Sequence, residues 1–396
     1  MNNPLILFRA IDCMTKKYPL LIGMYESQTI TGVAIAFQIL ISELEKQNMP
    51  FRKVNIGERQ KREKIGSFSS RRGFETLRAI IKSWIIIPSS NVIYITVGVS
   101  LLGFLRDAFI LLPAILLRKK TIIHVNSGGY KGFYNKQSFI SKKIIRAIIS
   151  KVTIIILLSD LLKDQFYFIN DDSKFRVVPN TVDPSLLDNN SISKKPGKDE
   201  AIKLLYLSNL IVDKGYLEVL EACRILKERN NVQFQCYFCG DFISTTSNIE
   251  QLTTNTKQQK DIFFGKIGNY HLDHQISYLG VVSGTEKKKV LQDSHLFILP
   301  THYPWEGQPL SIFEAMAYGL PVISTDYRAM PDQVQDGVTG YLLKTHDPAE
   351  IAARVEELWL NPEKYEEMSR QAIKKFWNEF SPEQHMQKMI QILYGD

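Results

Sequence analysis

Short apolar runs alternate along the chain with longer segments in which apolar residues recur every three or four positions. The short runs predict buried β-strands, and the longer segments predict amphipathic helices. In the first half, residues 33–47 have the helical spacing. The strands predicted there are residues 20–27, 91–98, 121–126, 153–160 and 175–180. Regular alternation of this kind predicts a parallel sheet covered by helices on both faces.

The same alternation starts again after residues 188–200, a polar segment with proline and glycine and no periodicity, which we interpret as a linker. The strands predicted beyond it are residues 203–210, 232–240, 276–282, 295–300 and 321–326. The predicted helices are residues 216–229, 309–318 and a tail from residue 347, which breaks at 380–382 before a last helix over 382–394. Residues 244–259 contain few apolar positions and predict a loop or a solvated helix.

A chain of 396 residues is too long for a single core. The pattern predicts an α/β protein with two Rossmann-like, doubly wound parallel-sheet domains that face each other across a cleft. We expect a first domain over 1–190, a linker over 191–200, a second domain over 201–377 and a final helical segment over 378–396. In such sheets ligands bind beyond the carboxyl ends of the strands.

Charge distinguishes the two halves, because residues 1–200 contain 30 basic and 16 acidic side chains, whereas residues 201–396 contain 19 and 25. The basic excess concentrates in residues 51–72, 116–120 and 130–146. A solvated surface would explain such clusters, but the aromatic and aliphatic residues interleaved with the charges favour an anionic membrane surface or a lipid pyrophosphate. We expect no nucleic-acid partner, since no helix-turn-helix, zinc-finger or RNP-like motif is present.

Residues 99–117 are long and apolar enough to cross a bilayer, but Arg106 and Asp107 within them favour a buried crossover helix. Residues 2–11 are interpreted either as a short interfacial helix or as a segment packed on the first domain. The first residues lack the pattern of a secretory signal. We therefore expect a cytoplasmic protein associated peripherally with the inner face of the cytoplasmic membrane.

Metal-binding motifs are not found in the sequence. Cys236 and Cys239 lie three apart on a predicted strand and face opposite sides, so they cannot share a ligand and are expected to be free buried thiols. No Asp-x-Asp or other acidic cluster would hold a divalent cation against a diphosphate. We expect no metal and no cofactor.

The stretch PWEGQPLSIFEAMAYGLPVISTD, residues 304–326, places two carboxylates around a strand-to-helix turn. Glu306 lies in the loop, and Glu314 follows about one turn into the helix. An ionised carboxylate on the apolar helix requires a partner. A helix N-terminus stabilises a phosphate, which makes the turn residues candidates for donor binding: Gly307, Gln308, Pro309, Leu310 and Ser311. The arrangement predicts a nucleotide-sugar between the two carboxylates.

This stretch resembles the E-x7-E motif of retaining GT-B glycosyltransferases, particularly family 4 (group 1) of bacterial polysaccharide and O-antigen synthesis. The resemblance implies that Glu306 contacts the donor sugar and Glu314 the nucleotide ribose. Residues 207–215, LSNLIVDKG, are similar to the family's Gly-Arg-x5-Lys-Gly turn and imply that Lys214 binds the donor diphosphate. Because Ser208-Asn209 replaces Gly-Arg, Asn209 would act as a neutral donor.

Shorter stretches extend the resemblance over most of the chain. Gly32 in TITGVA resembles a glycine loop facing the donor phosphates, and His124 in HVNSGG resembles a stretch whose histidine nears the transferring sugar. A simple turn and a structural histidine are the alternatives. Residues 239–242 and 278–282 resemble strand ends near the nucleotide, which adds Val282 to the donor-binding candidates. The final helix is implied to pack back on the first domain.

The resemblance implies transfer of a sugar from a nucleoside-diphosphate sugar, with UDP preferred, to a hydroxyl of a saccharide acceptor, with retention and without a metal. The candidate catalytic residues are Glu306, His124 and Lys214. The basic first domain would suit a polyprenyl-diphosphate-linked acceptor. A GT-B sugar-nucleotide epimerase and a non-catalytic carbohydrate- or lipid-binding protein of the same fold are the alternatives. A dehydrogenase is disfavoured, since no G-x-G-x-x-G follows the first strand.

Overall fold

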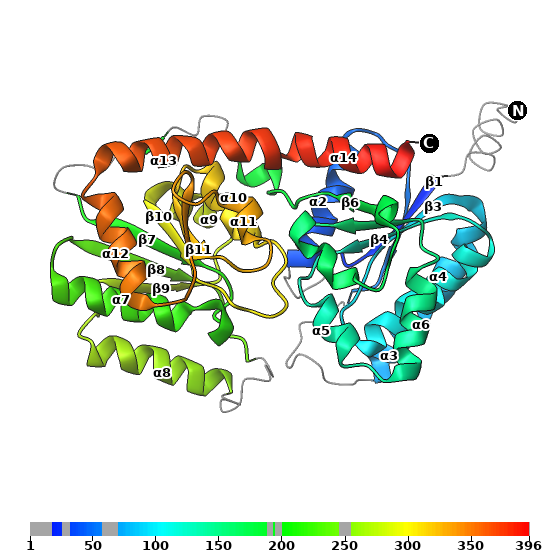
Figure 1. Ribbon diagram of the computed structural model, residues 1–396, viewed down its shortest axis with the longest axis horizontal. Helices are drawn as coiled ribbons and strands as arrows, with labels where there is room; N and C mark the ends of the chain where they lie inside the picture. The colour runs from blue at the N-terminus through cyan, green and yellow to red at the C-terminus, as the bar shows by residue number, and fades with distance from the viewer. Residues whose placement is uncertain are drawn as a thin grey trace, which may run out of the picture. The chain divides into compact units, whose positions relative to one another are not determined.

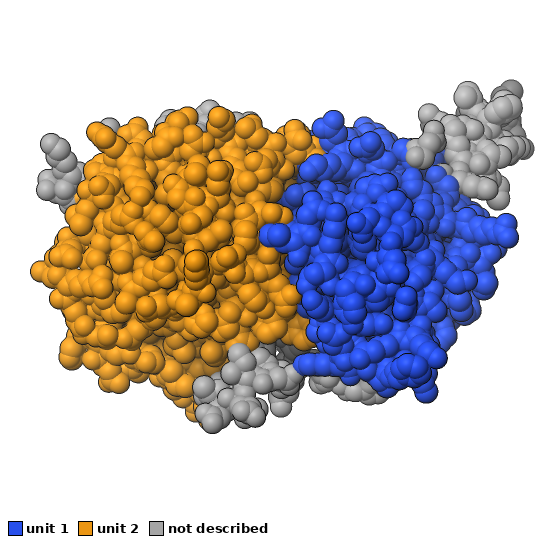
Figure 2. All heavy atoms as spheres, viewed as in Figure 1, with its two compact units in different colours: residues 1–180, 385–396 blue, residues 181–384 orange. Residues whose placement is uncertain are grey.

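A computed structural model describes residues 18–25, 32–57, 70–187, 193–194, 200–244 and 255–395. The chain divides into two compact units, coloured separately in Figure 2. Unit 1 contains residues 1–180 and 385–396, and unit 2 contains residues 181–384. The division after Asn180 comes earlier than the expected domain boundary at residue 190, and most of the expected linker lies outside the described residues.

Unit 1 contains a six-stranded parallel sheet in the order β2-β1-β3-β4-β5-β6 (Figure 1). Its strands are β1 (Tyr18–Gly23), β2 (Arg52–Asn55), β3 (Ser90–Thr96), β4 (Lys120–Val125), β5 (Ile154–Leu157) and β6 (Phe175–Val177). Alternate strand residues enter two separate cores, so that Leu20 and Ile22 face one side and Leu21 the other. This burial on both faces explains the continuous apolar runs in the sequence.

Helices cover both faces of this sheet. One core packs beneath α3 (Ser70–Ile86), α4 (Leu101–Leu116), α5 (Tyr130–Asn135) and α6 (Phe139–Ile149). The other packs beneath α2 (Gly32–Lys46) and α14 (Pro382–Tyr394). Met386, Met389 and Leu393 attach α14 to this second core, so the end of the chain is part of unit 1.

Unit 2 repeats the architecture with the strand order β12-β11-β10-β7-β8-β9, again parallel throughout. Its strands are β7 (Ile202–Leu207), β8 (Phe234–Cys239), β9 (Ile276–Gly280), β10 (Leu296–Leu299), β11 (Val322–Thr325) and β12 (Gly340–Leu343). Its helices are α7 (Tyr216–Arg229), α8 (Thr256–Asn269), α9 (Gly284–Asp293), α10 (Leu310–Ala317), α11 (Met330–Gln333), α12 (Pro348–Trp359) and α13 (Pro362–Lys375). The prediction of two doubly wound parallel sheets is confirmed.

Two strands were not predicted from the sequence, β2 in unit 1 and β12 in unit 2, and each lies at the edge of its sheet. β2 has the sequence RKVN, with only Val54 fully buried, so its apolar signal is weak. The break expected at 380–382 is confirmed, because a π-helical turn, Phe376–Phe380, precedes an extended Ser381. Cys236 and Cys239 are buried free thiols, as expected.

The helix within residues 99–117 is the expected crossover helix, because α4 connects the parallel strands β3 and β4, but it is buried on one face only. One face of α4 does enter the core, and Asp107 on that face pairs with Arg106 at 2.7 Å and accepts a hydrogen bond from the Gly98 amide at 2.8 Å. The other face is solvent-exposed, with Leu102 70% and Leu116 73% accessible. Within the described part of the chain, no helix combines the length and apolar composition that a membrane span requires.

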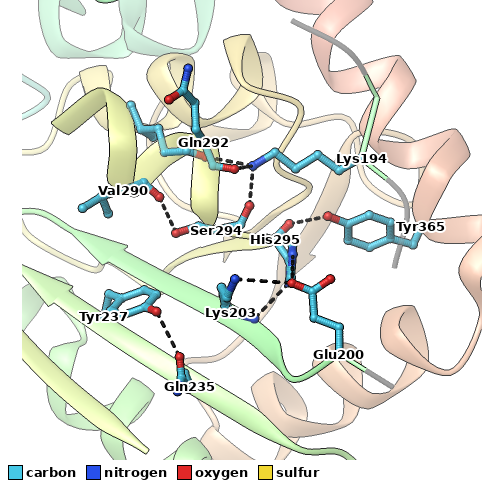
Figure 3. A network of polar contacts seen from close by, with 11 residues as sticks. Lys194, Glu200, Lys203, Gln235, Tyr237, Val290, Gln292, Ser294, His295 and Tyr365 are labelled. Atoms are coloured by element: carbon cyan, nitrogen blue, oxygen red, sulfur yellow. Dashed lines mark hydrogen bonds and ion pairs between the residues drawn. The ribbon is translucent and has the colours of Figure 1, made fainter. Parts of the chain in front are cut away.

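A partly buried polar network fixes the amino ends of β7 and β10 (Figure 3). The Lys194 ammonium caps the C-terminal end of α9 by donating to three carbonyl oxygens: Leu291 at 2.9 Å, Gln292 at 2.7 Å and Ser294. Burial lowers the pKa of Lys194 to about 7. His295 Nδ1 accepts a hydrogen bond from the Lys203 amide at 3.1 Å, and Tyr365 donates to the His295 carbonyl at 2.8 Å. The network therefore holds the C-terminal end of α9, at the amino ends of the strands, whereas the candidate site is expected at their carboxyl ends.

Candidate active site

The carboxyl ends of β7 and β10 are joined by direct contact between the loops that follow them. Gly215 has a φ of 80°, and a Cβ at this position would lie 2.6 Å from the Pro300 carbonyl oxygen. The His302 amide also donates to the Asp213 carbonyl oxygen at 2.8 Å. Only glycine permits this left-handed conformation and close approach together. The contact places Lys214 beside the loop that contains Glu306.

Lys214 and Glu306 form a largely buried ion pair with 3.1 Å between Nζ and Oε2. Thr301 Oγ1 donates to the same carboxylate oxygen at 3.3 Å, and the Lys214 ammonium donates to Ser208 Oγ at 3.1 Å. The ammonium also lies 5.5 Å from the centre of the Tyr303 ring. The structure thus brings together two of the three predicted catalytic residues, and it adds three neighbours that sequence reasoning did not assign to the site.

The turn after Glu306 leads into α10, which begins at Leu310 with Pro309 in the preceding position. Gly307, Gln308 and Pro309 are buried, while Leu310 and Ser311 are half-buried. The Pro309 carbonyl oxygen accepts a hydrogen bond from Gln333 Nε2 at 3.1 Å, which fixes the entry into the helix. The first-turn amides of an α-helix have no partner within the helix and carry the positive end of its dipole. This turn can therefore stabilise an anion.

Glu314 lies on α10 with only 3% of its surface exposed, and its partner is Lys287 on α9. The Lys287 ammonium lies 2.6 Å from each carboxylate oxygen. The sequence indicated that Glu314 needs a partner, but it did not identify Lys287. The parallel sheet brings the two residues together, because α9 and α10 are the helices before and after β10.

The remaining donor-site candidates are Asn209, Val282 and Gly32. Asn209 is half-buried after β7, where its carbonyl oxygen accepts from the Tyr206 hydroxyl at 3.3 Å. Val282 is buried in the apolar core of unit 2. Gly32 is exposed at the start of α2, and the residues before it, 26–31, lie outside the described part of the chain.

His124 lies in unit 1 at the carboxyl end of β4, and it is almost fully buried. Its Nδ1 shares a hydrogen bond of 2.6 Å with the Tyr94 hydroxyl, whereas Nε2 has no hydrogen-bond partner among the described residues. Burial and the neighbouring His385 lower the pKa of His124 to about 3. The imidazole is therefore neutral at neutral pH.

His385 on α14 should make stability depend on pH. Its Nδ1 donates to the Pro179 carbonyl oxygen at 2.7 Å, and burial lowers the pKa of His385 to about 4, with the Lys388 charge acting in the same direction. The unfolded chain binds this proton near pH 6.5, so stability is complete above that pH and falls as the pH drops toward 4. The expected loss at pH 5 is about 2 kcal/mol, from about 1.4 kcal/mol per pKa unit.

Urea unfolding at pH 7 and pH 5 measures this loss. In a His385→Asn variant, whose side-chain amide keeps a donor for Pro179 but does not titrate, the difference between the two pH values should shrink by about that amount. His124 and His295, whose pKa values are also lowered, remain in both proteins. An equal loss in wild type and variant would remove His385 as the cause.

The sequence of unit 2 matches a known family over most of its length. Residues 188–375 match the family model of Glycosyl transferases group 1. The chain is 32% identical over 168 residues to the putative colanic acid biosynthesis glycosyltransferase WcaL of Salmonella typhimurium, and 28% identical over 158 residues to the amylovoran biosynthesis glycosyltransferase AmsK of Erwinia amylovora. These matches cover 41% and 39% of this chain, but only 37% and 35% of the two relatives.

The fold is similar to solved structures over nearly the whole chain. A crystal structure of Anabaena HepE in complex with UDP and glucose superposes with a TM-score of 0.70, covering 96% of this chain and 99% of that one at 14% identity. The sucrose-phosphate synthase of Thermosynechococcus elongatus superposes with a TM-score of 0.66 at 15% identity. With these neighbours the GT-B fold class, two Rossmann-like domains, is confirmed.

Proposed function

We propose that the protein is a retaining glycosyltransferase of family 4 that transfers a sugar from a nucleoside-diphosphate sugar to an acceptor hydroxyl in bacterial surface polysaccharide synthesis. The main support is the buried Lys214–Glu306 pair at the carboxyl ends of two neighbouring strands, within the region that matches Glycosyl transferases group 1. The named functions of WcaL and AmsK support the polysaccharide context. UDP in the HepE complex supports a UDP-sugar donor.

In the proposed reaction, the bond between the anomeric carbon and the diphosphate oxygen breaks, and the diphosphate leaves with the electron pair. The acceptor oxygen bonds to the anomeric carbon on the same face, and its proton passes to the departing diphosphate. Lys214 and the first-turn amides of α10 stabilise the developing charge, without a metal, as preorganised electrostatics requires. Glu306 orients the donor sugar, Glu314 binds the ribose, and neutral His124 contacts the transferring sugar.

The acceptor is proposed to be a polyprenyl-diphosphate-linked saccharide, reached by a protein bound peripherally at the inner face of the cytoplasmic membrane. The basic excess of residues 1–200 supports an anionic lipid partner. No cofactor and no metal are required in this proposal, in which the nucleotide-sugar is a substrate. Asn209, Gly32 and Val282 stay candidates for donor contacts.

Thermal unfolding with UDP, GDP and ADP, each with magnesium or EDTA, tests the donor site. A nucleotide at about 100 times its dissociation constant should stabilise the fold by about 2.7 kcal/mol. We expect UDP to raise the unfolding temperature equally with magnesium and with EDTA, and Glu314→Ala to reduce the shift. No shift with any nucleotide would contradict the proposal, and a shift abolished by EDTA would contradict metal independence.

Product analysis distinguishes the alternative functions. Release of UDP that depends on a lipid-linked acceptor, with the anomeric configuration of the donor kept in the product, supports retaining transfer. A change in the sugar without an acceptor would indicate an epimerase. Nucleotide binding with neither reaction would indicate a binding protein of the same fold.

A further inference from the structure

Three neighbouring helices of unit 1 expose large apolar side chains in regular stripes. On α3 the exposed residues are Phe74, Leu77, Ile81, Trp84 and Ile85, and on α6 they are Phe139, Ile140 and Ile144. On α4 they are Leu101, Leu102, Leu105, Phe109, Leu112 and Leu116. The recurrence every three or four residues places each set on one side of its helix. We refer to these residues together as the α3/α4/α6 face.

The stripes lie on adjacent helices. α4 contacts both α3 and α6, and Figure 1 shows the three helices on the same side of the sheet. Pro113 in α4 has no amide hydrogen for the Phe109 carbonyl oxygen one turn earlier. Trp84 Nε1 of α3 donates to that oxygen instead, at 2.8 Å. This bond joins α3 and α4.

α4 has two apolar sides, and only one of them is buried. Its inner side, with Phe104, Ile110 and Leu111, already fills the core of unit 1. The outer apolar stripe is therefore not part of this core. An exposed apolar surface of this extent is typical of a protein–protein or membrane interaction site.

Charge indicates which of these partners fits the α3/α4/α6 face. Exposed basic side chains accompany the apolar stripes: Arg78, Lys82, Arg118, Lys143 and Arg146. The acidic residues in the sequences of the three helices are Glu75 and Asp107, and Asp107 is buried against Arg106. A second copy of this chain would bring two cationic surfaces together, whereas anionic lipid headgroups would complement the charges.

We propose that the α3/α4/α6 face docks on an anionic lipid bilayer, with its apolar stripes entering the interface and its cations contacting the headgroups. This proposal deepens the membrane association included in the proposed function. It assigns the contact to apolar side chains of α4 as well as to basic charge. Helices that lie in a membrane interface bind through both contributions together.

Vesicle co-sedimentation of the full chain tests the proposal. Wild type should bind vesicles of phosphatidylcholine with phosphatidylglycerol at least about 10-fold more tightly than phosphatidylcholine alone, since each cation near an anionic surface contributes about 1 kcal/mol. The variant Leu102→Gln/Phe109→Gln/Leu116→Gln should bind these vesicles at least about 10-fold more weakly than wild type, because the apolar area that enters the interface is lost. Arg78→Gln/Lys82→Gln/Arg146→Gln should lose the preference for anionic lipid.

A matched control removes exposed apolar residues of unit 2, through Phe264→Gln/Leu360→Gln, and should bind vesicles like wild type. If the α4 triple variant fails to fold, Phe109→Gln alone is compared. Equal binding by the α4 variant and wild type would overturn the proposal, as would wild type that binds neither vesicle. A dimer in sedimentation velocity that the α4 variant loses would assign the face to a second copy instead.

Thermal unfolding of the same variants with UDP tests the proposed transferase function separately from the proposed lipid contact. A retained nucleotide response with lost vesicle binding assigns the defect to the α3/α4/α6 face. A wild type that binds vesicles but responds to no nucleotide would contradict the proposed function and leave the lipid contact standing.

Discussion

Lys214→Met is expected to lower the rate of sugar transfer by about 10²–10³-fold, the cost of removing one preorganised charge from a developing anion. Methionine keeps much of the length of the side chain and removes its positive charge. It also leaves Glu306 buried opposite a neutral group, since the two charges are 3.1 Å apart in the structure. The loss is measured as kcat for acceptor-dependent UDP release.

A double variant separates catalysis from folding. Breaking a buried ion pair by removing one partner costs about 3–5 kcal/mol, whereas replacing both partners is much less costly. Lys214→Met/Glu306→Gln should therefore regain most of the stability lost by Lys214→Met, while kcat stays low. Recovery of kcat together with stability would show that the pair has only a structural role.

A control variant removes a cation of unit 2 whose pair is partly exposed. Lys375 pairs with Glu379 at 2.8 Å, and such pairs contribute about 1 kcal/mol or less. Lys375→Met should leave kcat unchanged. A loss of kcat comparable to that of Lys214→Met would indicate a general effect of charge in unit 2.

Glu314→Gln is expected to weaken UDP binding by about 10- to 100-fold. A hydrogen bond to a charged group contributes about 1.5–3 kcal/mol, and about 1.4 kcal/mol corresponds to a tenfold change in affinity. In the free protein this carboxylate is engaged by Lys287, 2.6 Å away, so Glu314→Gln also leaves a buried ammonium without its counter-ion. Isothermal titration calorimetry measures the affinity, and urea unfolding measures the stability.

Lys287→Met removes the cation of the Lys287–Glu314 pair. It should destabilise the fold by about 3–5 kcal/mol, because Glu314 then remains buried without a cation. Lys287→Met/Glu314→Gln should recover most of that stability but still bind UDP weakly, if Glu314 contacts the ribose. Affinity equal to wild type in the double variant would contradict the role proposed for Glu314.

The sequence by itself determined the architecture, both partners of the Lys214–Glu306 pair and one partner of the Glu314–Lys287 pair. Strands such as residues 121–126 are apolar because both of their faces are buried, so period and composition were sufficient to predict them. Glu306 was identified from its position in a strand-to-helix turn. Glu314 was identified as a carboxylate that needs a partner on an apolar helix. The edge strands β2 and β12 were missed, since each has only four residues, too few to show a clear period, and β2 is also weakly apolar.

Only the tertiary structure decided which residues meet. Lys287 and Glu314 are brought together because their helices flank the same strand, and local periodicity contains no information on contacts between helices. The same limit explains α4, whose sequence is apolar on two sides. Periodicity cannot tell a helix buried all round from one that buries one side and exposes the other. That distinction depends on which neighbours cover the helix, and here α3 and α6 leave its outer stripe exposed.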